Sequence, residues 1–348
     1  GVFRGTGIID DNLWFMTLRA GGVANVHGLF KLIPALILLP CAGLFAKVAE
    51  RLVPDQPEDP EDTMIKESIK QLDLRLITNP RIALGETHSM TSNMFEVSLH
   101  NYTACIQQMY EYDPKRNERM NQREDMIDMM TDVADKYVVE ISPHITLDYD
   151  DRYQSFLMKG LVSIERIGDL AINIMQSIIN MKSEDVQFSN VAMAELRVLM
   201  TAVNDILEMT ADAYKEKSHS MAQRIEPLEE VIDELVDKVR RRHMWRMKHN
   251  LCEVVRGISF QNIIQNLERI SDQCSDLGVN ILGLEDESIN GNEHQYLRDI
   301  HHSDDPLYNR LFAKYKAKYM GVLDSIAVDS VNGNEEEVEK QLKLDIEI

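Results

Sequence analysis

Apolar residues recur every three or four positions over most of the chain beyond residue 63, with polar residues between them. This period places the apolar side chains on one face of a helix, so it predicts amphipathic helices. No segment alternates apolar and polar residues over a length typical of a strand. The predicted fold is therefore all-α, an antiparallel helical bundle with short connections. Seven segments carry the helical pattern: residues 64–77, 86–112, 116–140, 151–182, 189–218, 225–249 and 251–284.

The first 53 residues have a different pattern, dominated by an uncharged run. Residues 32–46 are fifteen consecutive uncharged residues between Lys31 and Lys47. A membrane-spanning helix needs about 20 apolar residues, a length reached over about 29–49 when both lysines extend toward lipid headgroups. We therefore expect a transmembrane segment there, with a buried helix of a soluble domain as the alternative. Lys47 and Arg51 follow the run, so the positive-inside rule places the downstream chain in the cytoplasm.

Composition marks the other boundaries. Residues 54–63 are expected to form an acidic, proline-rich linker, because residues 54–62 hold three prolines and five acids and have nothing apolar to bury. Residues 327–348 are acidic and poorly patterned, which predicts a disordered tail. The helical domain then covers 64–326, with a last helix at about 293–326.

The charge of the chain restricts its partners. The formal net charge is −21, of which residues 1–53 contribute +2 and the remainder −23. Charge of that sign repels nucleic acid and attracts cations, so we expect no nucleic-acid partner. The four cysteines form no C-x-x-C pair, which argues against zinc and for a reducing compartment. No nucleophile elbow, Walker loop or Gly-x-Gly-x-x-Gly motif is present, so nothing indicates an enzyme.

An acidic helical unit occurs twice in the chain. Glu124–Asp128 and Glu229–Asp233 both read E-[DE]-[MV]-I-D, and Glu165–Asp169 and Glu268–Asp272 both read E-R-I-[GS]-D. The offsets between the copies are 105 and 103 residues, and near-constant offsets indicate an internal duplication. We place repeat one at about 83–182 and repeat two at about 189–285, each a three-helix bundle.

The paired carboxylates predict a cation site in each repeat. Two acids at i and i+4 share one helix face and repel each other by about 0.2–0.5 kcal/mol. Facing helices that each carry such a pair build di-iron and di-manganese sites in other bundles, and an all-oxygen ligand set suits iron, manganese or magnesium. The alternative is that Arg123, Arg166 and Arg269 neutralise the acids through salt bridges. The candidate metal ligands are Glu124, Asp128, Glu165, Asp169, Glu229, Asp233, Glu268 and Asp272.

This duplicated unit resembles the PhoU family of phosphate-response regulators. The resemblance covers about 83–285 and rests on the E-x-x-x-D motifs of consecutive helices, together with the E-R-I-[GS]-D signature. In that family the equivalent acidic clusters bind divalent or trivalent metal ions, multinuclear iron clusters among them. The resemblance therefore implies a PhoU-like, six-helix duplicated domain, and it assigns metal binding to the same eight residues.

The N-terminal part resembles a second family. Ala24–Phe30, followed by the apolar run with Pro40, looks like the last membrane segment of bacterial sodium/phosphate cotransporters, although Lys31 stands where asparagine is common. Leu72–Leu76 and Asn79–Leu84 resemble the start of their cytoplasmic regulatory domain, and the stretch 294–319 resembles its helical ending. Residues 1–53 would then be the end of a membrane transporter domain, and Gly1 would open a fragment or processed form of something longer.

Together the two resemblances imply a function. The expected protein is the C-terminal portion of a sodium-dependent phosphate symporter of the bacterial cytoplasmic membrane, whose PhoU-like domain binds metal and regulates phosphate uptake. Sodium and inorganic phosphate would be partners through the missing transporter core, the membrane would be another, and a homodimer is left open. The alternative is a stand-alone soluble PhoU-type regulator that acts on a separate transporter or kinase.

One basic segment interrupts the acidic chain. Residues 240–248 hold five basic side chains in nine positions, with Trp245 among them. The surrounding negative charge argues against a nucleic-acid patch. Two interpretations stay open: a contact with anionic lipid or a transporter, or a basic helix end that complements the helix dipole and neighbouring acids.

Overall fold

The computed structural model describes residues 20–39, 43, 59–249, 254–302 and 304–326, and every regular element in them is helical. The chain divides into two compact units, Gly1–Asp59 and Pro60–Ile348. Within the described residues the prediction of an all-α fold is confirmed. The predicted tail at 327–348 lies outside the described residues.

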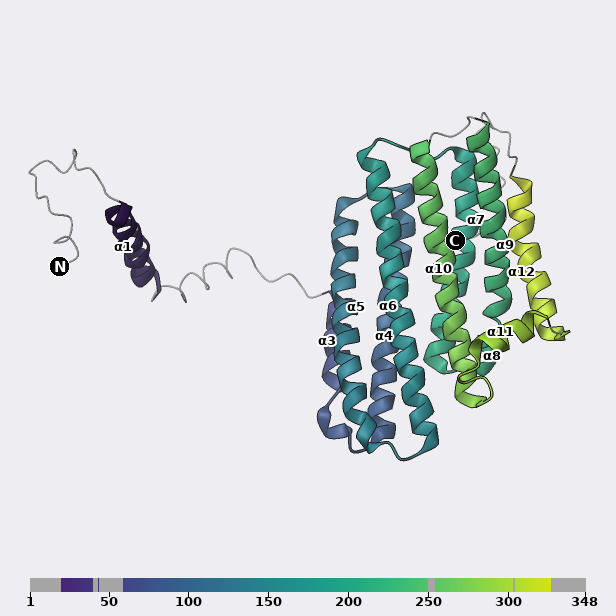
Figure 1. Ribbon diagram of the computed structural model, residues 1–348, viewed down its shortest axis with the longest axis horizontal. Helices are drawn as coiled ribbons and strands as arrows, with labels where there is room; N and C mark the ends of the chain where they lie inside the picture. The colour runs from purple at the N-terminus through teal and green to yellow at the C-terminus, as the bar shows by residue number, and fades with distance from the viewer. Residues whose placement is uncertain (1–19, 40–42, 44–58, 250–253, 303, 327–348) are drawn as a thin grey trace, which may run out of the picture. The chain divides into compact units, whose positions relative to one another are not determined.

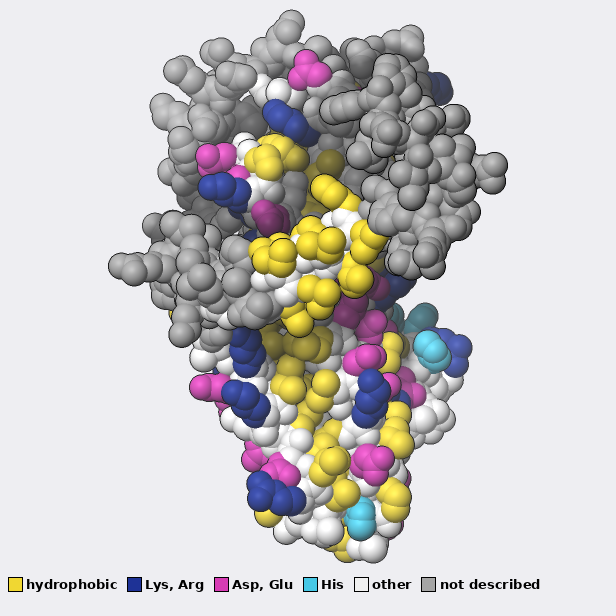
Figure 2. All heavy atoms as spheres, turned by 90° about the vertical axis from the view of Figure 1, so that its left-hand side faces the viewer, with side chains coloured by type: hydrophobic (Ala, Val, Ile, Leu, Met, Phe, Trp, Pro, Cys, Tyr) yellow, Lys and Arg dark blue, Asp and Glu magenta, His cyan; other side chains and the backbone are white. Residues whose placement is uncertain are grey.

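The first unit contains one described α-helix of several turns, α1 (Ala20–Leu38), which includes Pro34. Its apolar side chains are exposed, among them Phe30, Leu36 and Ile37, and hydrophobic atoms cover much of its visible surface in Figure 2. No described helix combines the length and apolarity required to cross a membrane. The structure therefore lends no support to the predicted transmembrane segment at 29–49, part of which lies outside the described residues.

The second unit is a bundle of long helices joined by short connections (Figure 1). Its elements are α3 (Pro60–Gln71), η3 (Leu74–Leu76), α4 (Pro80–Tyr110), α5 (Pro114–Ile141), η4 (Ser142–His144), α6 (Asp148–Ser183), α7 (Asn190–Glu216), α8 (His219–Ala222), α9 (Glu226–Lys248), α10 (Val254–Glu285), α11 (Glu293–His301) and α12 (Pro306–Ser325).

Two boundaries differ from the sequence prediction, each because a proline starts a helix. The expected linker 54–63 is helical from Pro60 onward, since proline suits the first helical position and acids in the first turn complement the helix dipole. The expected single helix over 293–326 is two helices, α11 and α12. Asp305 caps the second by accepting a hydrogen bond from the Tyr308 amide at 2.7 Å, and Pro306 follows it.

The two repeats pack as neighbouring bundles. Helices α4, α5 and α6 form the first and α7, α9 and α10 the second, with α6 against α10 at the seam between them. Each bundle has an added helix, α3 against α4 and α5, and α12 against α9 and α7. The buried Tyr102 hydroxyl of α4 donates a hydrogen bond to the Met200 carbonyl of α7 at 2.8 Å, which ties the bundles together.

This packing places the motif-bearing helices next to one another. Figure 1 shows α5, α6, α10 and α9 in succession, and each adjacent pair is in contact. The acidic pairs of one repeat therefore lie on helices that run side by side, as an up-and-down bundle requires.

Candidate metal centre

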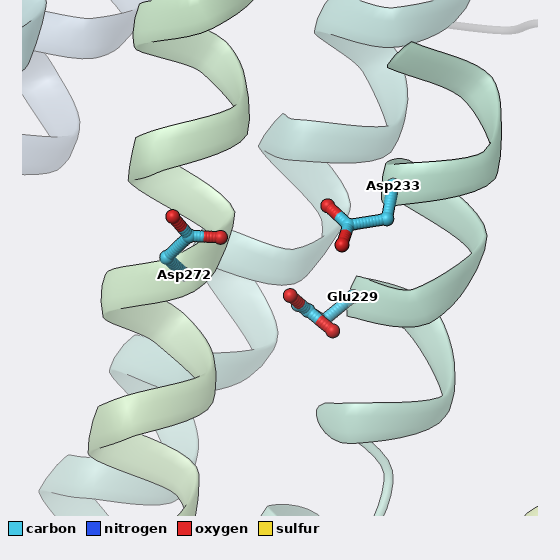
Figure 3. Close-up of side chains that lie close together, drawn as sticks. All are labelled: Glu229, Asp233 and Asp272. Atoms are coloured by element: carbon cyan, nitrogen blue, oxygen red, sulfur yellow. The ribbon is translucent and has the colours of Figure 1, made fainter. Parts of the chain in front are cut away.

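Three carboxylates of the second repeat converge between α9 and α10. Glu229 and Asp233 are one turn apart on α9, so they share a face of that helix, and Asp272 reaches toward them from α10 (Figure 3). One oxygen of each lies within 4.8 Å of the others. That spacing lets three carboxylates ligate one ion.

The environment of this cluster disfavours negative charge. Burial raises the pKa of Glu229 well above its ordinary range, and the charges of Glu226 and Asp233 add to the effect. Burial, followed by the charge of Asp272, raises the pKa of Asp233 to about 7, and burial with the charge of Glu268 raises that of Asp272 to about 6. The Oδ1 atom of Asp233 is buried without a hydrogen-bond partner among the described residues. A cation among these oxygens would supply the missing charge and contacts.

Glu268, the fourth predicted ligand of this repeat, is paired differently. Its Oε2 accepts a hydrogen bond from Nη2 of Arg240 at 2.9 Å, across the same pair of helices. An arginine therefore partly neutralises one end of the seam, whereas none of the three converging carboxylates forms an ion pair with a residue that the structure describes. The sequence shows no signal for this pairing, because Arg240 and Glu268 are 28 residues apart.

Glu226 and His301 are neighbours of the cluster that sequence reasoning did not select. Glu226 is buried one turn before Glu229 and accepts hydrogen bonds from the Ser275 hydroxyl and from Nε2 of His301, the latter at 2.6 Å. The signal was present, since Glu226 precedes Glu229 by three positions and so shares its helix face. The contribution of His301, from α11, depends on tertiary packing.

The first repeat builds a related but looser cluster between α5 and α6. Both carboxylate oxygens of Glu124 are buried without a hydrogen-bond partner among the described residues. Burial, with the charges of Asp169 and Asp128, raises the pKa of Glu124 to about 8. Burial and the charge of Asp169 also raise the pKa values of Asp128 and Glu165. All four predicted side chains thus interact, but no three of them converge as closely as in repeat two within the described residues.

Gly168, inside the second motif of repeat one, explains the burial of Glu124. A Cβ atom at this position would lie 3.0 Å from Oε2 of Glu124 and 3.0 Å from Cδ1 of Ile127. The absence of a side chain therefore lets the Glu124 carboxylate approach the backbone of α6. Repeat two has Ser271 at the matching position.

The arginines next to the motifs do not neutralise these clusters. Nε of Arg123 donates to Glu61 of α3 at 2.8 Å, so its ion pair is with α3 and not with the motif acids. Arg166 contacts Asp169 at 3.6 Å, with both side chains about half exposed, and such a pair contributes little. Arg269 forms no ion pair with another residue that the structure describes, although its charge opposes the rise in the pKa of Asp272. The residues present therefore fit a bound cation better than a salt-bridged surface.

Comparisons with known proteins agree with this architecture. The PhoU domain family model matches residues 196–281, which run from α7 to α10 and include the converging carboxylates. The phosphate-specific transport system accessory protein PhoU homolog 1 of Thermotoga maritima is 24% identical over 178 residues, covering 51% of this chain and 75% of the relative.

Two solved structures share the fold. PhoU from Pseudomonas aeruginosa superposes with a TM-score of 0.55 at 19% identity, over 58% of this chain and 96% of that one. The phosphate transport system regulatory protein PhoU from Streptococcus pneumoniae gives a TM-score of 0.55 at 17% identity, over 60% and 98%.

The fold and the site define a duplicated helical-bundle protein with acidic seams. Residues 196–281 match the PhoU domain, and the chain is similar to a PhoU homologue over about half of its length. The prediction of a PhoU-like helical domain is thereby confirmed, whereas the assignment to the sodium/phosphate cotransporters stays a prediction.

Proposed function

We propose that this chain is a PhoU-type regulator of phosphate transport that binds metal cations at its acidic seams and acts on a separate transporter or kinase. One observation supports the metal-binding part: Glu229, Asp233 and Asp272 converge in a site that raises their pKa values, and none of them forms an ion pair with a described residue. The regulatory part is supported by the PhoU domain, which contains these residues. The matching relative is named as an accessory protein of phosphate transport.

The three carboxylates would hold the cation, and Glu124, Asp128, Glu165 and Asp169 would contribute a second site. Ligation requires ionised carboxylates, so protons leave Glu229 and Asp233 as the site fills. Because the ligands come from both α9 and α10, a filled site would also clamp these helices together. A bound metal would supply positive charge and open coordination positions for phosphate.

Metal content tests the first part. The variant Glu229→Gln/Asp233→Asn/Asp272→Asn is purified beside the parent chain, and bound iron, manganese and magnesium are measured by elemental analysis. The matched control is Glu208→Gln/Asp212→Asn, because this pair has the same E-x-x-x-D spacing on an exposed face of α7. We expect the site variant to lose the metal of the second repeat and the control to keep it. Equal metal content in all three proteins would refute the site.

Phosphate uptake tests the regulatory part. Cells that express the site variant in place of the parent should lose the dependence of uptake on the phosphate supply, whereas cells with the control variant should retain it. Metal loss without any change in uptake would reject the regulatory function and leave metal binding intact. The two parts of the proposal are therefore separable.

A second candidate function is the C-terminal portion of a sodium-dependent phosphate symporter of the bacterial cytoplasmic membrane. It is favoured by the resemblance at Ala24–Phe30 and by the exposed apolar side chains of α1. In this case α1 would belong to the transporter, and the helical domain would lie in the cytoplasm. The upstream reading frame decides between the candidates: further apolar spans, together with sodium-dependent uptake by the whole gene product, would favour the symporter.

A further inference from the structure

The basic segment 240–248 separates into internal and exposed charges once it is folded. Arg240 donates a hydrogen bond to the Glu268 carboxylate at 2.9 Å. Arg246 is buried and forms two hydrogen bonds with the fully buried Glu195, at 2.6 and 2.9 Å. Arg242 adds a contact to Glu195 at 3.5 Å. Three of the five basic side chains are therefore part of the internal structure, as expected for a helix end that complements neighbouring acids.

The remaining side chains form one exposed stripe along α9. Arg241, Met244, Trp245 and Lys248 follow the spacing i, i+3, i+4, i+7, which places them on one helix face. Met244 is 63% exposed and Trp245 39%. Arg241 and Lys248 are exposed, and neither forms an ion pair with another residue that the structure describes. We call these four residues the α9 stripe.

The chemistry of the α9 stripe is that of a membrane interface. Tryptophan is enriched at the headgroup level of bilayers, because its apolar ring and polar N–H both find suitable surroundings there. Arg241 and Lys248 flank the apolar pair Met244 and Trp245, so their positive charges can interact with anionic lipid headgroups. Contact with the headgroup layer would remove the apolar surface of Met244 and Trp245 from water, and lipid phosphate groups would attract the cations of Arg241 and Lys248.

The charge of the whole chain favours this occupant over nucleic acid. A net charge of −21 repels a long polyanion that extends over the molecule. A membrane can instead contact only the C-terminal end of α9. Acidic residues farther than about 8 Å from that contact repel it little, because their charges are largely screened at physiological salt. We propose that the α9 stripe docks on the headgroup layer of an anionic phospholipid membrane. This docking surface is separate from the acidic seams and goes beyond the proposed regulation by metal.

The fluorescence of Trp245 can report whether the α9 stripe contacts lipid. The chain has two tryptophans, so Trp14→Phe in the full-length chain leaves Trp245 as the sole fluorophore. The protein is mixed with phosphatidylcholine vesicles that contain or lack phosphatidylglycerol, with brominated lipid as a quencher in the bilayer. We expect a blue shift and quenching of Trp245 with anionic vesicles, a much smaller response with neutral vesicles, and reversal by high salt.

Charge variants test the role of the stripe. Arg241→Gln/Lys248→Gln in the Trp14→Phe background should weaken vesicle binding about thirtyfold, since each basic residue near the surface contributes about fivefold. The matched control is Arg310→Gln/Lys314→Gln on α12, two exposed cations that also lack an ion pair among the described residues. This control should bind as the parent does. Far-ultraviolet circular dichroism and thermal unfolding check that both variants are folded.

Several outcomes would overturn the proposal. If the chain sediments with vesicles while Trp245 stays unquenched, another segment, such as α1, contacts the lipid. Equal quenching by neutral and anionic vesicles would remove the role of the cations. An Arg241/Lys248 variant that binds as tightly as the α12 control would have the same consequence.

Discussion

Replacing Asp233 with asparagine is expected to stabilise the metal-free protein at pH 8. The Asp233 carboxyl has a pKa of about 7 in the folded chain, against an ordinary value of 3.8. Above pH 7 the folded state must keep it ionised in a site that favours the neutral form, so ionisation costs stability. The difference between the two values corresponds to about 4 kcal/mol, and partial solvent access reduces the expected gain to about 2 kcal/mol.

The sign of the pH dependence follows from the raised pKa. Because the folded state holds the proton more tightly than the unfolded state, the destabilisation is complete above about pH 7 and fades as the pH falls toward 4. Thermal unfolding of chelator-treated protein should therefore show a higher Tm for Asp233→Asn at pH 8, by about 4 °C. At pH 5 the gain should be less than half as large.

Added metal should reverse the order of stability. Saturation of the parent at 100 times Kd adds about 2.7 kcal/mol, whereas the variant lacks one ligand and should gain less. The control is Asp212→Asn on α7, an exposed acid outside the cluster, which should leave both the metal-free Tm and the gain from metal unchanged. An unchanged or lower Tm for metal-free Asp233→Asn at pH 8, or an equal gain from metal in both proteins, would refute the reasoning.

Three further predictions concern other parts of the structure. Gly168→Ala should push the Glu124 carboxylate away from α6 and lower metal content in the first repeat only, measured by elemental analysis of chains with the second site removed. Its effect on stability should be small, because the higher helix propensity of alanine offsets the crowding. Arg246→Met leaves Glu195 buried without its principal partner, and chemical denaturation should show a loss of about 3–5 kcal/mol, largely restored when Glu195 is also made leucine. His301 has a pKa raised by its hydrogen bond to a carboxylate of α9, so the stability it adds should be present below its ordinary pKa of 6.5 and be lost as the pH rises through the raised value. A pH series of unfolding curves for His301→Ala checks this, and a difference that persists at pH 9 would contradict it.

The sequence by itself determined the helical fold, the duplication and the pairing of acids. These features depend on local geometry: the helical period sets which residues share a face, and short connections make consecutive helices antiparallel neighbours. The prediction that Glu229 and Asp233 would meet Asp272 needed nothing more. The resemblance of the repeat to the PhoU family likewise rested on local motifs.

Only the tertiary structure decided which carboxylates remain without a partner. Arg240 reaches Glu268 across two helices, and Gly168 lets Glu124 bury its carboxylate against α6. Glu195 engages Arg246, 51 residues away, and thereby turns part of a basic segment into internal structure. Such pairings depend on the rotation and approach of packed helices, which depend on the fit of side chains over their whole interface. No single motif in the sequence encodes that fit.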